Sequence, residues 1–194
     1  MLSRWLPAPS MPPIWTGAPR HVSCPAMSDN ISTVTTRLVS RGDLTAIAAL
    51  HAHVFGPGRF ARTAYRVREG HRLVSPYCRV AFDGQRMIAT LKFTEIKVGG
   101  QGGALLLGPL AVDPDYAGQG YGRRLVAEGT SDAMGRGASL IILIGDEPYY
   151  GRFGFKRTAP GQIVFPGPVD PARILAAELK VGALARYGGL VTAE

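Results

Sequence analysis

The sequence predicts a mixed α/β domain: a mostly antiparallel sheet with one central parallel βαβ unit, formed by its fourth and fifth strands, and with flanking helices. Residues 77–98 hold two apolar runs joined by Asp83-Gly84, a dipeptide typical of β-hairpins. Residues 139–144, SLIILI, are wholly apolar, as in a strand covered on both faces. A segment with helical spacing separates this strand from an apolar strand at 104–112, so these two strands should be parallel.

The chain before the hairpin predicts one strand and two helices. Residues 33–40 alternate in the manner of a strand, and Asp43 then stands at the N-cap of a helix that ends near residue 56. His51 lies on the apolar side of that helix, where a partly buried structural role is expected. Residues 60–70 predict a second helix, rich in arginine, which is either a solvated face or the rim of a ligand cleft.

The helix of the βαβ unit should pack closely on the sheet, because small residues interrupt its apolar stripe. The stripe consists of Gly122, Leu125, Val126, Gly129 and Ala133. After the strand at 139–144 we expect a turn at 149–155, a strand at 162–165, a helix at about 171–180 and a last strand near Leu190.

Length and composition predict one globular domain at 28–194. Residues 1–27 are rich in proline without periodicity, so we expect a disordered tail or a misassigned start, with Met27 as the initiator. No apolar run is long enough for a membrane span. Two cysteines and four histidines form no disulfide framework or metal set, so we expect a cytoplasmic protein without a metal. The net charge of +8 favours anionic partners.

A glycine-rich loop at 117–122, AGQGYG, precedes the predicted helix of the βαβ unit. Unpaired backbone N–H groups and the positive end of the helix dipole favour an anion there, and glycines let a phosphate approach the backbone. The spacing is neither that of a P-loop, which needs a Gly-Lys-Ser/Thr end, nor the G-x-G-x-x-G of a dinucleotide fold.

Gly108-Pro109 interrupts the strand at 104–112. Proline cannot donate to a strand ladder, so it marks a bulge or a break, after which Leu110–Val112 should separate from the neighbouring strand. A ligand with amides of its own would pair with the freed backbone. Phosphates at the glycine loop and amides along the strand together describe coenzyme A.

The stretch LGPLAVDPDYAGQGYGRRLV resembles motif A of the GNAT (Gcn5-related) N-acetyltransferase superfamily, R/Q-x-x-G-x-G/A with its preceding L-x-V-x-P-x-Y/F. Residues 150–155, YGRFGF, are similar to the Y-x-x-x-G-F of that family, and the order of elements also fits over about 33–165. The C-terminal AELKVGALARYGG resembles a bacterial subgroup of the family whose members are mostly uncharacterised.

The resemblance implies a GNAT fold that uses acetyl-CoA as co-substrate. The backbone of Leu110–Val112 would pair with the pantetheine arm and bind the acetyl carbonyl, and the glycine loop with Arg123 would hold the pyrophosphate. Tyr150 would protonate the departing thiolate, with Tyr149 as its rival. The implied cofactor-binding residues are Leu110, Ala111, Val112, Ala117, Gly118, Gln119, Gly120, Tyr121, Gly122 and Arg123.

The sequence departs from the family pattern at three points. Ala117 replaces the usual Arg or Gln of motif A, and the asparagine common after the fifth strand is missing, with Asp146 as the nearest polar residue. Residues 105–112 contain no carboxylate that could act as general base. Glu95, on the preceding strand, is either that base or a surface residue; a water-relayed base and a neutral incoming amine are the alternatives.

These observations predict an N-acetyltransferase that moves an acetyl group from acetyl-CoA to a primary amine by direct attack. A domain that binds acyl-CoA as a sensor without catalysis is the alternative. We do not expect a membrane or nucleic acid as partner, because the basic stretch 59–72 has few interleaved aromatics. The sequence leaves the amine acceptor undefined and a homodimer open.

Overall fold

The computed structural model describes residues 34–58, 63–68 and 74–194. The described strands are β1 (Thr35–Leu38), β2 (Arg79–Asp83), β3 (Arg86–Val98), β4 (Gln101–Val112), β5 (Leu140–Ile144), β6 (Lys156–Arg157), β7 (Ile163–Val164), β8 (Ile174–Glu178) and β9 (Gly189–Ala193). The described helices are α1 (Leu44–Phe55), α2 (Thr63–Arg66), α3 (Tyr121–Gly135) and α4 (Glu147–Tyr150). The predictions for residues 1–27 lie outside the described residues, as do residues 59–62 and 69–73 of the predicted basic stretch.

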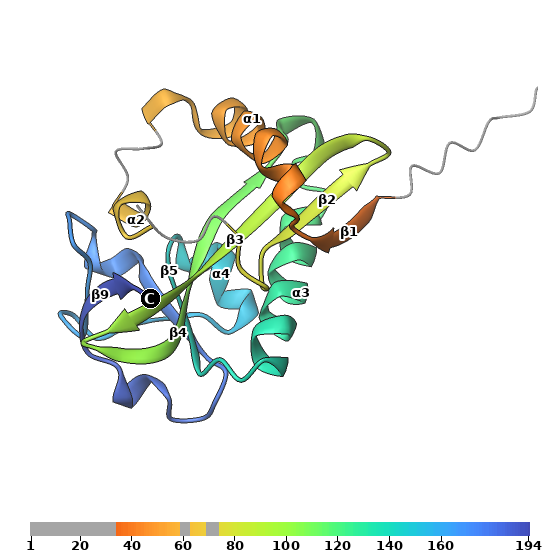
Figure 1. Ribbon diagram of the computed structural model, residues 1–194. Helices are drawn as coiled ribbons and strands as arrows, with labels where there is room; N and C mark the ends of the chain where they lie inside the picture. Colours follow the sequence, from red (N-terminus) through yellow and green to blue (C-terminus); the bar gives the residue numbers. More distant parts are fainter. Residues whose placement is uncertain (1–33, 59–62, 69–73) are drawn as a thin grey trace, which may run out of the picture. The chain divides into compact units, whose positions relative to one another are not determined.

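The strands form one sheet in the order β1-β2-β3-β4-β5-β8-β6, and β9 pairs with both β3 and β7 (Figure 1). The hairpin of β2 and β3 and the antiparallel pair of β3 and β4 are confirmed. The parallel pairing of β4 with β5 is also confirmed: Ala104 lies opposite Leu140, and Leu106 lies opposite Ile142. Strand β4 begins before the predicted residue 104, because Gln101 already belongs to it.

Both faces of the central strands are buried, as the apolar sequence of β5 predicts. On one face, Leu125 and Val126 of α3 belong to a core cluster with Phe93, Leu105 and Ile141. On the other face, α1 packs through Leu50 against Val80. The predicted stripe of α3 is confirmed, since its five residues are the buried residues of that helix. The glycine at position 129 is required by the packing, because a Cβ there would lie 2.5 Å from the Phe93 ring.

The predicted helix at 171–180 is wrong. Residues 171–173 form a single 3-10 turn and residues 174–178 form β8, which pairs antiparallel with β5 and with β6. The segment ILAAELK has good helix formers, but the two ladders and the burial of Leu175 outweigh that local preference. The two-residue strand β6 was too short to leave a pattern in the sequence.

Asp43 stands at the N-cap of α1 as predicted, but its carboxylate does not cap that helix. It instead accepts hydrogen bonds from the backbone N–H of Ser40 at 2.7 Å and from the guanidinium of Arg37 at 2.7 Å. The side chain thus fastens the 3-10 turn at 41–43 to the end of β1, and so sets where α1 begins.

None of the helices in the described ranges is long and apolar enough to cross a membrane. The cytoplasmic setting and the homodimer stay predictions.

Candidate functional site

The site is built on the divergence of β4 from β5. The two strands are paired from Ala104–Leu140 to Leu106–Ile142, and their pairing then stops. Two residues further on, the Gly108-Pro109 peptide is cis and Gly108 has φ 114°, a conformation that favours glycine. The register between β3 and β4 shifts at the same place, between Leu107 and Leu110. The expected break in the strand is therefore present.

Beyond the break, alternate backbone amides of β4 point away from β3. The N–H of Asp113 donates to the carbonyl of Ile88 at 2.8 Å, which makes these two residues a hydrogen-bonded antiparallel pair. Hydrogen-bonded and non-hydrogen-bonded pairs alternate along an antiparallel ladder, so the next hydrogen-bonded pair is Ala111 with Thr90. The N–H and C=O groups of Leu110 and Val112 consequently face the side from which β5 has diverged, as a ligand with amides would require.

The glycine loop meets this strand at the N-terminus of α3. Gly118 and Gly120 have φ 76° and 90°, which side chains with a Cβ rarely adopt. The first hydrogen bond of α3 runs from the N–H of Arg124 to the carbonyl of Gly120. The N–H groups of residues 121–123 come before it and have no acceptor carbonyl within the helix. The side chain of Arg123 lies over the loop, with Nη2 3.3 Å from the position of a Cβ on Gly120. Helix polarity and the arginine both favour an anion at this point.

The Pro-Asp turn between β4 and the loop is held by Asp113. Its carboxylate accepts a hydrogen bond from the N–H of Asp115 at 3.1 Å and one from Arg86 at 2.8 Å. Burial alone would raise the pKa of Asp113, but these hydrogen bonds outweigh it and the pKa is lowered. The carboxylate stays ionised and fixes the loop to the β2–β3 hairpin, because Arg86 begins β3. Gln119 is also tied into the turn, through the carbonyl of Asp115 at 3.1 Å.

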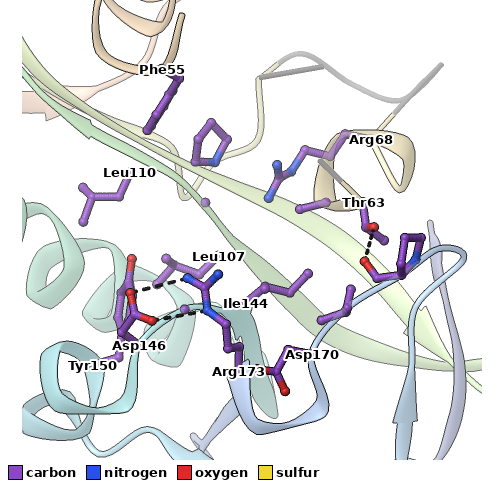
Figure 2. Close-up of a pocket in the computed structure, with 16 residues that line it drawn as sticks. Phe55, Thr63, Arg68, Leu107, Leu110, Ile144, Asp146, Tyr150, Asp170 and Arg173 are labelled. Atoms are coloured by element: carbon purple, nitrogen blue, oxygen red, sulfur yellow. Dashed lines mark hydrogen bonds and ion pairs between the residues drawn. The ribbon is translucent and has the colours of Figure 1, made fainter. Parts of the chain in front are cut away.

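A cavity of about 560 Å³ opens at the break. It lies among α1, α2, the middle of β4, the end of β5 and the loop before β8 (Figure 2). Its lining residues are Phe55, Thr63, Ala64, Arg68, Leu107, Gly108, Pro109, Leu110, Ile144, Gly145, Asp146, Tyr150, Pro168, Val169, Asp170 and Arg173. The cavity thus adjoins the free amide of Leu110 on one side and has polar groups on the other.

The two candidate tyrosines have different surroundings. Tyr150, the last residue of α4, lines the cavity, and burial raises its pKa to about 12. Its ring lies against Gly145, where a Cβ would be 2.5 Å from Cε2. Tyr149 is 37% exposed, and its hydroxyl lies 3.1 Å from the position of a Cβ on Gly122, at the start of α3. Of the two, Tyr150 is therefore beside the break in β4, and Tyr149 is beside the anion-binding loop.

Two polar contacts hold the far wall of the cavity. Arg173, from the turn before β8, pairs with Asp146, the N-cap of α4, at 3.2 Å (Figure 2). Thr63 of α2 donates from Oγ1 to the carbonyl of Pro168 at 2.7 Å. These contacts tie the loop 168–173 to α4 and α2. The sequence did not predict Thr63, Asp170 and Arg173 as residues of the site, because they belong to no motif. Arg68 belongs to the predicted helix at 60–70, for which the rim of a ligand cleft was one of two interpretations.

Glu95 does not line this cavity. It lies opposite Leu105 in the β3–β4 pair, and its charge adds to burial in raising the pKa of Tyr77. The described residues that surround the break therefore do not include the carboxylate named from the sequence. In the described ranges, no group of three His, Cys, Asp or Glu side chains is placed to hold a metal.

The profile of the family described as "Acetyltransferase (GNAT) domain" matches residues 35–158, which is more than half of the chain. The chain belongs to the GNAT family. The uncharacterised N-acetyltransferase YhbS of Escherichia coli K12 is 32% identical to this GNAT chain over 118 residues, covering 60% of this chain and 70% of YhbS.

Two solved GNAT structures extend this likeness to the fold. The crystal structure of E. coli YhbS in complex with CoA has a TM-score of 0.70 and 29% identity, and the match covers 83% of this chain and 89% of that one. A GNAT acetyltransferase from Brucella melitensis in complex with acetyl-CoA has a TM-score of 0.57 and 27% identity, over 78% of this chain and 98% of that one.

Proposed function

We propose that this GNAT domain is an N-acetyltransferase that moves an acetyl group from acetyl-CoA to a primary amine. The observation that carries the proposal is the geometry of β4: the free amides of Leu110 and Val112 lie between an anion-binding helix terminus and a cavity large enough for a small acceptor. The relatives bound to CoA and acetyl-CoA support this choice of co-substrate.

The residues present fit acetyl-CoA from its pyrophosphate to its thioester. The N–H groups of residues 121–123, the glycines of the loop and Arg123 would bind the pyrophosphate. The backbone of Leu110–Val112 would pair with the pantetheine amides. The N–H of Leu110, at the edge of the cavity, would then donate to the thioester carbonyl and polarise it.

In the proposed reaction the amine nitrogen bonds to the acetyl carbon, the bond from that carbon to sulfur breaks, and the amine loses a proton. Tyr150 would donate a proton to the leaving thiolate; a tyrosine phenol is protonated at neutral pH, and burial raises the pKa of this one further. No covalent enzyme intermediate is needed. The rate acceleration would come from positioning the amine beside the thioester and from polarising its carbonyl. We do not assign Glu95 as base; a neutral incoming amine or a water relay serves that step.

Thiol release by the full chain, measured against a broad panel of amines, tests the proposal together with calorimetry of acetyl-CoA binding. We expect acetyl-CoA to bind and at least one amine to accelerate thiol release and to appear as its N-acetyl product. Binding without turnover on any amine would instead identify a sensor that holds acyl-CoA, and absence of binding would exclude both functions.

A further inference from the structure

Acetyl transfer places a negative charge beside Tyr150. When the bond from the acetyl carbon to sulfur breaks, its electron pair stays on the sulfur, and the phenol of Tyr150 then offers its proton. Whether the proton is on the sulfur or on the phenol oxygen, these two atoms together carry one negative charge until the proton lost by the amine reaches them. A cation near the phenol would lower the free energy of this charge.

Arg173 is the arginine on that side of the cavity. Figure 2 shows Tyr150, Asp146 and Arg173 together on one side and Arg68 across from them. Burial is the main cause of the raised pKa of Tyr150; beyond burial, the charges of Tyr149 and Asp146 raise this pKa and the charge of Arg173 lowers it. The charges of Asp146 and Arg173 therefore both act on the phenol, in opposite directions.

The carboxylate of Asp146 holds this guanidinium by one edge. Nε of Arg173 lies 3.2 Å from Oδ1 of Asp146, and Nη2 donates to Oδ2 at 3.4 Å. In the part of the chain that the structure describes, Nη1 of Arg173 has no hydrogen-bond partner. One nitrogen of the fork is therefore left for a charge that forms in the cavity.

Backbone hydrogen bonds place Arg173 and Tyr150 relative to each other. The N–H of Gly145, at the end of β5, donates to the carbonyl of Arg173 at 2.9 Å. One residue further on, the carbonyl of Asp146 accepts the N–H of Tyr150 at 3.1 Å. The arginine and the tyrosine are thus both attached to the same two residues, so the guanidinium stays on the side of the cavity where the phenol lies.

We propose that Arg173, held by Asp146, assists acetyl transfer through its charge, by stabilising the negative charge that the leaving sulfur and the phenol oxygen of Tyr150 share. The inference rests on the proposed function and adds a residue to its chemistry. Before the bond to sulfur breaks, the charges of Asp146 and Arg173 offset each other. The charge that appears afterwards meets a guanidinium already in place, which is how a preorganised site lowers a barrier.

Variants of the two partners should have unequal effects on kcat, measured by thiol release with the amine of the panel that turns over fastest. Arg173→Gln should lower kcat about tenfold; the loss is smaller than the roughly 100-fold or more for a donor that touches an oxyanion, because Arg173 is half exposed. Arg173→Lys keeps the charge and should keep most of kcat. Asp146→Asn keeps an acceptor for Arg173 but removes the offsetting charge, so kcat should equal or exceed that of the wild type.

Arg157→Gln is the matched control. Arg157 of β6 pairs with Glu147, the next residue of the same short helix, with Nε 2.7 Å from Oε2 and with exposure similar to that of Arg173. It is not among the residues that line the cavity. If the two arginines only hold α4 in place, their variants should lose kcat alike. We expect Arg157→Gln to keep the kcat of the wild type.

The thiol of bound CoA gives a readout that needs no acceptor. Its pKa can be measured from the ultraviolet absorbance of the thiolate, as a difference between CoA-bound and free protein. Tyr150→Phe is the background for this titration, because the phenol in the cavity then does not titrate. A nearby cation favours the thiolate and a nearby anion disfavours it, so Arg173→Gln should raise the pKa of the thiol and Asp146→Asn should lower it. Arg157→Gln should leave it unchanged.

Some outcomes would overturn the inference alone. An unchanged kcat in Arg173→Gln, an equal loss in Arg157→Gln, or a thiol pKa that none of the variants moves would leave an acetyltransferase without this role for Arg173. An exposed ion pair contributes little to stability, so the variants should fold, which urea unfolding checks. If Arg173→Gln does not fold, Arg173→Lys and Asp146→Asn decide through the same two readouts. Acetyl-CoA binding without turnover on any amine would instead overturn the proposed function, and the inference with it.

Discussion

At the scale of single residues, the chemistry depends on where two adjacent tyrosines lie. Their ring centroids are 4.8 Å apart, yet Tyr150 lines the cavity and Tyr149 lies against Gly122. Sequence alone ranks them only by the spacing to Gly154-Phe155. The structure adds a difference in place and in degree, since burial raises the pKa of both phenols and raises that of Tyr150, the one at the cavity, to about 12.

Tyr150→Phe should lower kcat by about 100-fold, the lower end of the range for general acid catalysis, because it removes the proton donor and little else. The affinity for acetyl-CoA should be unchanged in calorimetry, since the phenol takes no part in binding the pyrophosphate or the pantetheine. The matched control is Tyr149→Phe, for which we expect kcat close to that of the wild type. Equal losses in the two variants would remove Tyr150 from the role of acid.

The pH profile gives a second readout. With the pKa of Tyr150 raised to about 12, the acid stays protonated as pH rises through the usual tyrosine range near 10. The kcat of the wild type should accordingly show no alkaline fall near pH 10.

At the scale of elements, the glycine loop and the N-terminus of α3 act as one anion site. Gly120→Glu should weaken acetyl-CoA binding by about 100-fold or more, because two like charges about 4 Å apart repel by roughly 4 kcal/mol at an effective dielectric constant of 20. Gly137→Glu is the matched control: Gly137 has φ 84°, close to the 90° of Gly120, and a Cβ there meets nothing within 4 Å. Both variants should lose similar stability, and calorimetry should find weaker binding in Gly120→Glu alone.

The ion pair of Arg37 and Asp43, at the turn before α1, should make the stability of the fold depend on pH. Hydrogen bonds from Arg37 hold the pKa of Asp43 well below its usual range. A carboxyl with a lowered pKa stabilises the fold above its unfolded pKa of about 3.9 and loses that contribution as pH falls through the folded value. Asp43→Asn should therefore cost about 1–2 kcal/mol at pH 7, and the difference from the wild type should shrink below about pH 4.

Urea unfolding of the wild type and Asp43→Asn at several pH values measures this difference. Arg37→Gln and the double variant complete a cycle that isolates the ion pair, whose arginine is half exposed. A difference that does not change between pH 7 and pH 3 would contradict the role given to the carboxylate.

The elements also show which parts of the fold a sequence can predict. The stripe of α3 is readable because a helix on a sheet must place its small and apolar residues at fixed intervals. Strand β8 is not, since ILAAE becomes a strand only through its partners β5 and β6, which lie some twenty or more residues earlier. Local propensity carries no information about such partners.

At the scale of the whole molecule, the site lies where strands β4 and β5 separate within the sheet. Strands β1–β4 and strands β5, β8 and β6 meet through the three residue pairs between β4 and β5. Gly108-Pro109 predicts that division from the sequence. The cavity does not follow from it, because Arg68, Asp146 and Arg173 come from segments far apart in the chain and meet only in the folded structure.

A ligand that pairs with β4 should extend hydrogen bonding into this division, and amide hydrogen exchange can follow it residue by residue. We expect saturating CoA to slow exchange at Leu110 and Val112, whose N–H groups face the gap, and at residues 121–123 at the helix terminus. Exchange at Ala111, which pairs with Thr90, should change less, so the expected pattern alternates along the strand. Gly120→Glu under the same conditions is the control, because it should show no slowing at either place. Uniform slowing from Leu110 to Val112 would point to general stiffening of β4 and would contradict pairing of the ligand with its free edge.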